Sequence, residues 1–368
     1  MQKLIIVSIF LIVSSIANAF ETEAKYAILM DYDSKAILFE KESQTQMAPS
    51  SMSKMLTAYI AFEHLKSGQV KLEDMFPISE KAWKMEGTRM FIPLNAKVSF
   101  EDLLKGLIIQ SGNDAAVAIS EILMGSEEEF ANTMNETAKK LGLTNSHFTN
   151  ATGLPDTNNY SCAQDLAIIA YHSIKDFPEY YHYYSEKEFT YNGIKQGNRN
   201  GLLYKDIGAD GLKTGHADDA GFGLTASVKR KDRRLIAVVN GLPSNKVRTA
   251  EMEKLINYGM MNFVKVQIAE KGQIIEQTQV ANGNKSEVSL ITDNEINFII
   301  PKSEVKNIKT TIRYNTPLAA PIASGDQLGE LIIESPSVHG VTYKLVAKED
   351  VGKASFIQRI KNSINDIF

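Results

Sequence analysis

Strand-like segments at both ends of the first 262 residues, with helical segments between them, constrain the fold most strongly. Residues 25–30 (KYAILM) and 36–39 (AILF) flank a polar turn, which predicts a β-hairpin. Much later in the chain, residues 221–227 and 235–240 (LIAVVN) predict two further strands. We therefore expect residues 20–262 to form an α+β domain, in which a central antiparallel sheet joins strands from both ends of the segment.

Two helices of this segment have recognisable ends. The pattern from Met52 to Lys66 is helical, with its apolar residues on or near one side and Gly68 as its end. Ser126 and Glu129 match a capping box, which predicts a helix that starts there and ends at Gly142.

The pattern changes after residue 262. Residues 263–350 contain short β-rich runs separated by Gly, Pro, Asn and Asp, which predicts a small all-β domain. Residues 351–368 predict an amphipathic helix, because apolar residues such as Phe356, Ile360 and Ile364 recur at steps of three and four. Such a helix either packs on the β domain or lies on a membrane surface.

The first 19 residues predict a secretory signal peptide. Lys3 supplies a positive charge, residues 4–16 form an apolar segment, and Ala17 and Ala19 are small residues at the positions that a signal peptidase reads. Cleavage is expected before Phe20, and the alternative is an uncleaved membrane anchor. The apolar run is short for a span of about 20 residues, which favours cleavage.

Composition excludes several classes of function. A formal net charge of −4 gives no reason to expect a nucleic-acid partner. Cys162 is the only cysteine, so no intramolecular disulfide is possible, and we expect it to be a buried small residue. The six histidines include no H-E-x-x-H pair, and no phosphate-binding or dinucleotide fingerprint occurs, so we expect neither a metal nor a cofactor.

The first chemical motif is Ser51-Met52-Ser53-Lys54, at the start of a predicted helix. A spacing of three places Ser51 and Lys54 one turn apart on the same face. A serine hydroxyl is a poor nucleophile until a base accepts its proton, and lysine is a base only when burial or a nearby cation lowers its pKa. Alone, the motif is weak, and an N-capping serine with a solvated lysine is the favoured interpretation.

Two later motifs could complete a site. Ser111-Gly112-Asn113 places a hydroxyl and an amide on a tight turn before the helical run 114–124, where the serine could relay a proton and the amide could hold the lysine. Lys213-Thr214-Gly215-His216 predicts an edge strand. Lys213 would be a second cation that lowers the pKa of Lys54, Thr214 could bind a carboxylate, and Gly215 could let a ligand lie close to the strand.

The combination S-x-x-K, S-x-N and K-T-G, in this order, is typical of penicillin-binding proteins and class A β-lactamases. The segments PSSMSKMLTAYI, LIIQSGNDAAVA, KEFTYNGIKQGNRNGLL and GLKTGHADDAGFGL resemble the D-alanyl-D-alanine carboxypeptidases, the low-molecular-mass penicillin-binding proteins. The resemblance covers essentially the whole chain after residue 19, although after Phe263 it rests on architecture rather than on motifs. It implies the penicillin-binding-protein/β-lactamase-like fold for the first domain.

The resemblance also implies roles for the residues. Ser51 would attack the carbonyl between two terminal D-alanines, Lys54 would take the serine proton, Ser111 would pass a proton to the leaving amine, and Asn113 would position the substrate. The backbone N–H groups of Ser51 and His216 would hold the oxyanion. Arg199 and Arg248 would help Thr214 to recognise the terminal carboxylate, and a surface salt bridge is the alternative for each arginine.

The expected partners are peptidoglycan stem peptides, β-lactam antibiotics and, through the C-terminal helix, the outer face of the inner membrane. Three other functions compete with the carboxypeptidase. A β-lactamase would need a deacylating glutamate, and no matching E-x-x-L-N segment occurs. An endopeptidase that cuts cross-links shares every motif. A non-enzymatic, wall-associated scaffold is disfavoured because all three motifs are intact.

Overall fold

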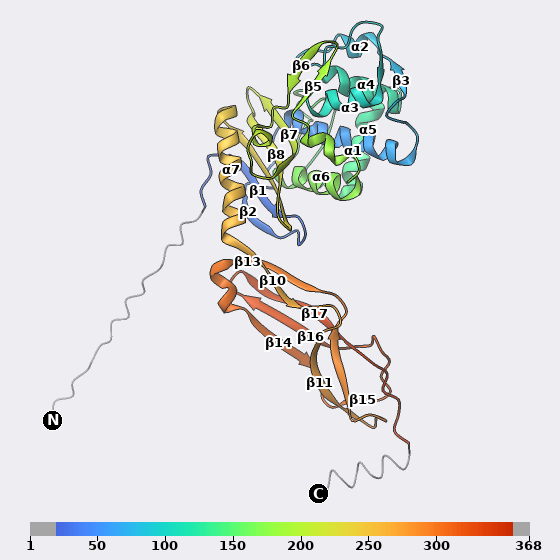
Figure 1. The fold of residues 1–368 in the computed structure, drawn as a ribbon, viewed down its shortest axis with the longest axis vertical. Coiled ribbons are helices and arrows are strands. Elements are labelled where there is room, and N and C mark those ends of the chain that lie inside the picture. Colours follow the sequence, from blue (N-terminus) through green and yellow to red (C-terminus); the bar gives the residue numbers. More distant parts are fainter. Residues whose placement is uncertain (1–19, 356–368) are drawn as a thin grey trace, which may run out of the picture.

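The computed structural model describes residues 20–355. The expected signal peptide at 1–19 and residues 356–368 of the expected C-terminal helix lie outside the described residues. The described chain forms a helix-covered sheet region, from which the long helix α7 (Asn245–Asn262) leads into an all-β region (Figure 1). The expected α+β domain followed by a β-rich domain is confirmed.

The first region alternates strands and helices. Its strands are β1 (Tyr26–Asp31), β2 (Ile37–Lys41), β3 (Met75–Pro77), β4 (Lys97–Ser99), β5 (Glu188–Tyr191), β6 (Ile194–Gly197), β7 (Ala209–Ala217), β8 (Gly221–Arg230) and β9 (Arg233–Leu242). Its other helices are α1 (Lys54–Ser67), α2 (Glu80–Trp83), α3 (Phe100–Ile108), α4 (Asn113–Met124), α5 (Glu127–Leu141) and α6 (Ala163–Asp176). Short 3-10 turns are η1 (Ser50–Ser53), η2 (Tyr181–Ser185) and η3 (Gly201–Tyr204).

The main sheet has five antiparallel strands in the order β2-β1-β9-β8-β7. The hairpin β1–β2 therefore pairs with β9, a strand that lies 200 residues later, as the positions of the apolar runs predicted. β7, which carries Lys213 to His216, is an edge strand, also as predicted.

Both faces of this sheet are covered, and the strand sequences show why. On β9, Ile236 and Val238 pack into a core with α1 and α3 to α6, whereas Leu235, Ala237 and Val239 pack into a second core with α7. Successive side chains of a strand point to opposite faces, so a strand covered on both sides needs an unbroken apolar run such as LIAVV.

The helix α1 lies at the centre of the helical layer. The sequence predicted a helix from Met52 with one apolar side, but the α-helix begins at Lys54 after the turn η1, and every residue from Lys54 to Phe62 is buried. All sides of this first part of α1 are buried, so its polar residues Lys54 and Thr57 also lie inside the protein, whereas Glu63, Lys66 and Ser67 near the end of α1 are exposed. Its end at Gly68 is confirmed, where a left-handed φ of 75° suits glycine.

The predicted cap of α5 is half formed. Ser126 Oγ accepts a hydrogen bond from the Glu129 N–H at 3.1 Å, and Gly142 ends the helix. The Glu129 carboxylate instead accepts a hydrogen bond from Asn132 Nδ2 at 3.5 Å, so it caps no N–H of Ser126.

The second region consists of two sheets. Strands β10 and β13 form one pair, and the other sheet has six strands in the order β14-β16-β17-β12-β11-β15. The strands are β10 (Phe263–Ala269), β11 (Ile274–Ala281), β12 (Glu287–Thr292), β13 (Ile296–Pro301), β14 (Lys309–Tyr314), β15 (Leu318–Ala319), β16 (Gln327–Ser335) and β17 (Val338–Ala347), and the 3-10 turn η4 spans Lys302–Asn307.

The expected start of the C-terminal helix is wrong. Val351 forms a β-bridge with Ile322, and Lys353 forms another with Gly283, so residues 351–355 are extended. These backbone hydrogen bonds to the β region replace those that a helix from Gly352 would make. None of the helices within residues 20–355 is both long enough and apolar enough to span a membrane.

Candidate active site

The nucleophile candidate Ser51 lies in the turn η1, directly before α1. A Cβ atom on Gly215 would lie 2.8 Å from Pro49 O and 3.2 Å from Met52 Cγ, so only glycine lets the edge strand β7 approach this turn. The sequence led us to expect that Gly215 makes room for a ligand. Its missing side chain instead makes room for the turn that carries Ser51.

Lys54 lies one turn after Ser51 and is buried, with 1% of its surface exposed. Its Nζ is 3.2 Å from Ser51 Oγ, 2.8 Å from Asn113 Oδ1 and 2.5 Å from the backbone oxygen of Thr152. The predicted contact between the two residues of the first motif is therefore present, and the second motif supplies a further partner.

The pKa of Lys54 is lowered to about 7, first by burial, because the interior disfavours the charged ammonium, and second by the nearby Arg199 guanidinium. The carboxylates of Asp114 and Glu127 act in the opposite direction. The sequence assigned the role of neighbouring cation to Lys213, and the two lysines do interact, which lowers the pKa of Lys213. Arg199 is the cation that lowers the pKa of Lys54, and Lys213 is itself shifted by Lys54.

The partners of Lys54 orient it as a base. A neutral amine has two N–H groups and one lone pair, whereas carbonyl oxygens only accept. Asn113 Oδ1 and Thr152 O therefore take the two N–H groups of neutral Lys54. The lone pair is left for the third neighbour, the Ser51 hydroxyl, which then donates its proton toward Nζ.

Ser111 and Lys213 form a second pair in the same site. Lys213 Nζ donates hydrogen bonds to Ser111 Oγ at 2.9 Å and to its neighbour Thr214 O at 3.2 Å. Burial lowers the pKa of Lys213 well below its usual value, and the positive charges of Lys54, Arg199 and Arg248 add to this effect. Ser111 has a positive φ of 62°, an unusual conformation for a serine that places a functional side chain.

A buried carboxylate next to the second motif stabilises the structure around it by hydrogen bonds. Asp114, at the first turn of α4, accepts hydrogen bonds from the backbone N–H groups of Met90, Phe91 and Ile92. The adjacent Asn113 donates from Nδ2 to Glu86 O at 2.8 Å, which fixes its Oδ1 toward Lys54. The sequence analysis missed Asp114, although it follows the S-G-N motif directly.

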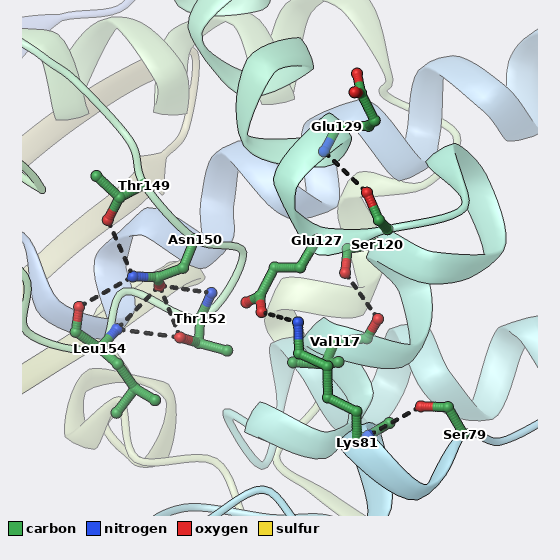
Figure 2. Close-up of polar contacts among 12 residues, drawn as sticks. Ser79, Lys81, Val117, Ser120, Glu127, Glu129, Thr149, Asn150, Thr152 and Leu154 are labelled. Atoms are coloured by element: carbon green, nitrogen blue, oxygen red, sulfur yellow. Dashed lines mark hydrogen bonds and ion pairs between the residues drawn. The ribbon is translucent and has the colours of Figure 1, made fainter.

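The carbonyl of Thr152 is held in place by Asn150. Asn150 Oδ1 accepts hydrogen bonds from the N–H groups of Thr152, Gly153 and Leu154 and from the Thr152 hydroxyl, as Figure 2 shows. Figure 2 also shows Glu127, at the start of α5, paired with Lys81 at 2.8 Å. The sequence analysis missed Asn150 and Thr152, because a backbone oxygen leaves no motif and the segment lies almost 100 residues from Lys54.

A cavity of about 420 Å³ opens beside Ser51. The predicted site residues that line it are Ser51, Ser111, Thr214, Gly215, His216, Arg199 and Arg248. Lys54 and Lys213 lie behind this lining and form hydrogen bonds to it, Lys54 to Ser51 and Lys213 to Ser111 and Thr214. Asn113 is joined to the lining through Lys54. The His216 ring stacks near Phe222, with the ring centroids 3.9 Å apart.

The two arginines make the cavity positive. Arg248 is 4% exposed and donates hydrogen bonds to Arg199 O, Gly223 O and Asn245 Oδ1. Burial, with Arg199 nearby, lowers its pKa to about 10. Within residues 20–355, neither arginine pairs with a carboxylate, so the alternative of a surface salt bridge is wrong.

A serine hydroxyl, an amine whose lone pair faces it, and a cationic cavity together form the arrangement of a serine hydrolase. The comparisons with known proteins give the family. The profile of the D-alanyl-D-alanine carboxypeptidase family, Peptidase_S11, matches residues 13–244, and the profile of the C-terminal domain of penicillin-binding protein 5 matches residues 263–353. The chain belongs to the D-alanyl-D-alanine carboxypeptidase family.

Individual proteins agree with this assignment. D-alanyl-D-alanine carboxypeptidase DacA from Haemophilus influenzae is 40% identical over 92% of this chain and 87% of its own length. The crystal structure of penicillin binding protein 5 from H. influenzae matches with a TM-score of 0.80 and 40% identity, over 91% of this chain and 99% of that chain. Penicillin-binding protein D2 from Listeria monocytogenes in its ampicillin-bound form matches with a TM-score of 0.61 and 27% identity, over 66% of this chain and 99% of that chain.

Proposed function

We propose that this protein removes the terminal D-alanine from peptidoglycan pentapeptides, with Ser51 as nucleophile and Lys54 as its base. The enzyme is a serine-type D-alanyl-D-alanine carboxypeptidase, as its family membership indicates. The observation that carries the assignment of Ser51 is the contact between its Oγ and the Nζ of Lys54, a lysine whose pKa burial lowers to about 7.

In the acylation step, Ser51 Oγ attacks the carbonyl carbon between the two terminal D-alanines and its proton moves to Lys54 Nζ. The backbone N–H groups of Ser51 and His216 hold the oxyanion. When the C–N bond breaks, the leaving amine of the last D-alanine needs a proton. Ser111 donates its hydroxyl proton to this amine. The proton that Lys54 took from Ser51 then passes to Ser111. Lys213 holds the Ser111 hydroxyl through its hydrogen bond of 2.9 Å.

The terminal carboxylate of the substrate binds in the cationic end of the cavity. Thr214 offers a hydroxyl there, and Arg199 and Arg248 offer charge that no carboxylate of the described chain neutralises. The Arg248 guanidinium is buried, and an unneutralised buried charge is costly, so a bound carboxylate stabilises this arrangement.

Water then hydrolyses the acyl-enzyme. The described residues that line the cavity include no acidic side chain, so it lacks the deacylating glutamate that a β-lactamase would use. Penicillins share the carboxylate and the reactive carbonyl of the substrate, and we propose that they acylate Ser51, as ampicillin is bound to the Listeria protein.

Location and domain roles are further parts of the proposal. Residues 1–19 direct export and are removed, residues 20–262 carry catalysis, and residues 263–350 form a separate β domain. The tail 351–368 attaches the enzyme peripherally to the periplasmic face of the inner membrane. Apolar residues at helical spacing in 356–368 support this attachment.

Replacement of the nucleophile tests the proposal. Ser51→Ala should abolish covalent labelling by a fluorescent penicillin and the release of D-alanine from a pentapeptide, measured by mass. Ser53→Ala is the matched control, because Ser53 lies in the same turn and its Oγ has no hydrogen-bond partner among the described residues. Labelling of Ser51→Ala at the wild-type level would remove Ser51 from this role. Splitting of a cross-linked muropeptide, without loss of D-alanine, would favour an endopeptidase.

A further inference from the structure

The segment N-R-N-G, at residues 198–201, alternates buried and exposed side chains. Asn198 and Asn200 are buried, whereas Arg199 between them is exposed. Asn198, Arg199 and Gly201 line the cavity beside Ser51, and Asn200 does not belong to its lining. The side chain of Arg199 therefore lies on the cavity side of the segment, and the side chain of Asn200 lies inside the protein.

Asn200 joins this segment to the strand β7. Its Nδ2 donates a hydrogen bond to Gly211 O at 2.9 Å, and Gly211 lies on β7 three residues before Thr214. Its Oδ1 accepts the N–H of Leu202 at 3.1 Å. A carbonyl oxygen only accepts and an N–H only donates, so these two partners fix the orientation of the amide. One buried side chain thus connects the backbone beside Arg199 to the strand that carries Thr214.

The other hydrogen bonds of Asn198 and Arg199 run to different elements. Asn198 Nδ2 donates to Glu186 O at 3.1 Å, in the residues before β5, and Asn198 Oδ1 accepts the Asn200 N–H at 3.0 Å. Arg199 O accepts a hydrogen bond from Arg248 Nη2, on α7, at 3.1 Å. These contacts hold the segment against its neighbours on the other sides. The bond from Asn200 therefore sets the register between Arg199 and β7.

The Arg199 guanidinium depends on this backbone for its position. It forms no hydrogen bond or ion pair with any residue from 20 to 355, whereas the Arg248 guanidinium is held by Gly223 O and Asn245 Oδ1. Hydrogen bonds weaken steeply when their distance and angle depart from the ideal, including those to a charged group. Arg199 and Thr214 can therefore bind one carboxylate only while the two backbones that carry them keep their separation.

We propose that Asn200 is a positioning residue for recognition of the terminal carboxylate of the substrate. Its amide holds Arg199 in register with Thr214 on β7, so that both side chains contact the same carboxylate. Asn200 itself touches neither the substrate nor the reacting atoms. This inference rests on the proposed carboxypeptidase function and adds a residue that acts through Arg199.

Two peptides that differ only in the terminal carboxylate test the inference. They are Nα,Nε-diacetyl-L-lysyl-D-alanyl-D-alanine and the same peptide with a C-terminal carboxamide. The wild-type kcat/KM should favour the acid by about 10²-fold, because the carboxamide loses the charge-assisted hydrogen bonds. Asn200→Ala should reduce this preference by about 10-fold. Because the readout is a ratio, a smaller fraction of folded enzyme cancels.

Further variants assign the effect to Arg199. Arg199→Gln should reduce the preference at least as much as Asn200→Ala does. Addition of Asn200→Ala to Arg199→Gln should change the preference by less than about 2-fold, because the residue through which Asn200 acts is already absent. Asn200→Leu has a side chain of similar size without the Nδ2 donor, and it replaces Asn200→Ala in the test where the alanine variant does not fold.

Lys205→Met is the matched control. Lys205 is exposed, follows the same segment, and pairs with Glu253 on α7. The variant therefore removes a different contact that holds these residues in place. The preference for the acid should stay at the wild-type level.

Each outcome decides one of the two proposals. Equal losses of kcat/KM for both peptides in Asn200→Ala or Asn200→Leu, with an unchanged preference, would overturn the inference and leave the carboxypeptidase intact. They would show that Asn200 only maintains the fold. Full preference in Arg199→Gln would contradict carboxylate binding by Arg199, and the inference with it. No release of D-alanine from the acid by the wild-type enzyme would instead contradict the proposed function.

Discussion

Lys54 Nζ lies 2.8 Å from Asn113 Oδ1, so the first and second motifs of the sequence meet through one buried hydrogen bond. This contact joins the start of α1 to the start of α4. Asn113 Oδ1 and Thr152 O accept the two N–H groups of the neutral amine. The lone pair of Nζ then points toward the Ser51 hydroxyl. In the proposed mechanism, the protonation state of Lys54 therefore determines whether Ser51 can react.

The rate of acylation by penicillin should rise with pH through about 7. The pKa of Lys54 is lowered to about 7 by burial, and only the neutral amine accepts the serine proton. Below this pKa, most Lys54 carries a proton, so the rate at pH 6 should be about one tenth of its high-pH plateau. Stopped-flow labelling between pH 5.5 and 9 measures the profile. A rate that is flat over this range would contradict Lys54 as the base.

Two substitutions should move the midpoint of this profile in opposite directions. Arg199→Gln removes a positive charge that disfavours the ammonium form, so the midpoint should rise. Glu127→Gln removes a negative charge that favours the ammonium form, so the midpoint should fall. Glu128→Gln is the control: Glu128 is the exposed neighbour of Glu127 and is not among the charges that shift the pKa of Lys54, so the midpoint should stay unchanged. Parallel shifts of both variants would refute this electrostatic account.

Much of the fold followed from local patterns. The hairpin β1–β2, the edge position of β7 and the β-rich second region were each predicted from runs of apolar residues and their spacing. The exception in the core is the first part of α1, where the polar residues Lys54 and Thr57 are buried. The amphipathic pattern of a surface helix cannot describe a stretch in which every residue from Lys54 to Phe62 is buried.

The sequence predicted those site residues whose side chains belong to motifs, and it did not predict the others. Ser51, Lys54, Ser111, Asn113 and Lys213 meet as expected. Thr152 contributes a backbone oxygen, which any residue type could supply, and Asp114 acts through backbone N–H groups. Burial was anticipated as a cause of the low pKa of Lys54, but the contribution of Arg199 was not. Burial of Lys54 and its distances to Arg199 and Lys213 arise only in the folded chain, so the spacing of residues in the sequence cannot predict them.

The loop that presents Thr152 to Lys54 should depend on Asn150. Asn150→Ala removes the acceptor of three backbone N–H groups, which should lower the free energy of unfolding by about 1 to 3 kcal/mol. Displacement of Thr152 O frees an N–H of Lys54, so acylation should slow by about 10²-fold. Urea denaturation and penicillin labelling measure the two effects. Asn158→Ala changes an exposed asparagine in the same loop and should alter neither quantity. Wild-type acylation in Asn150→Ala would show that Thr152 O does not orient the base.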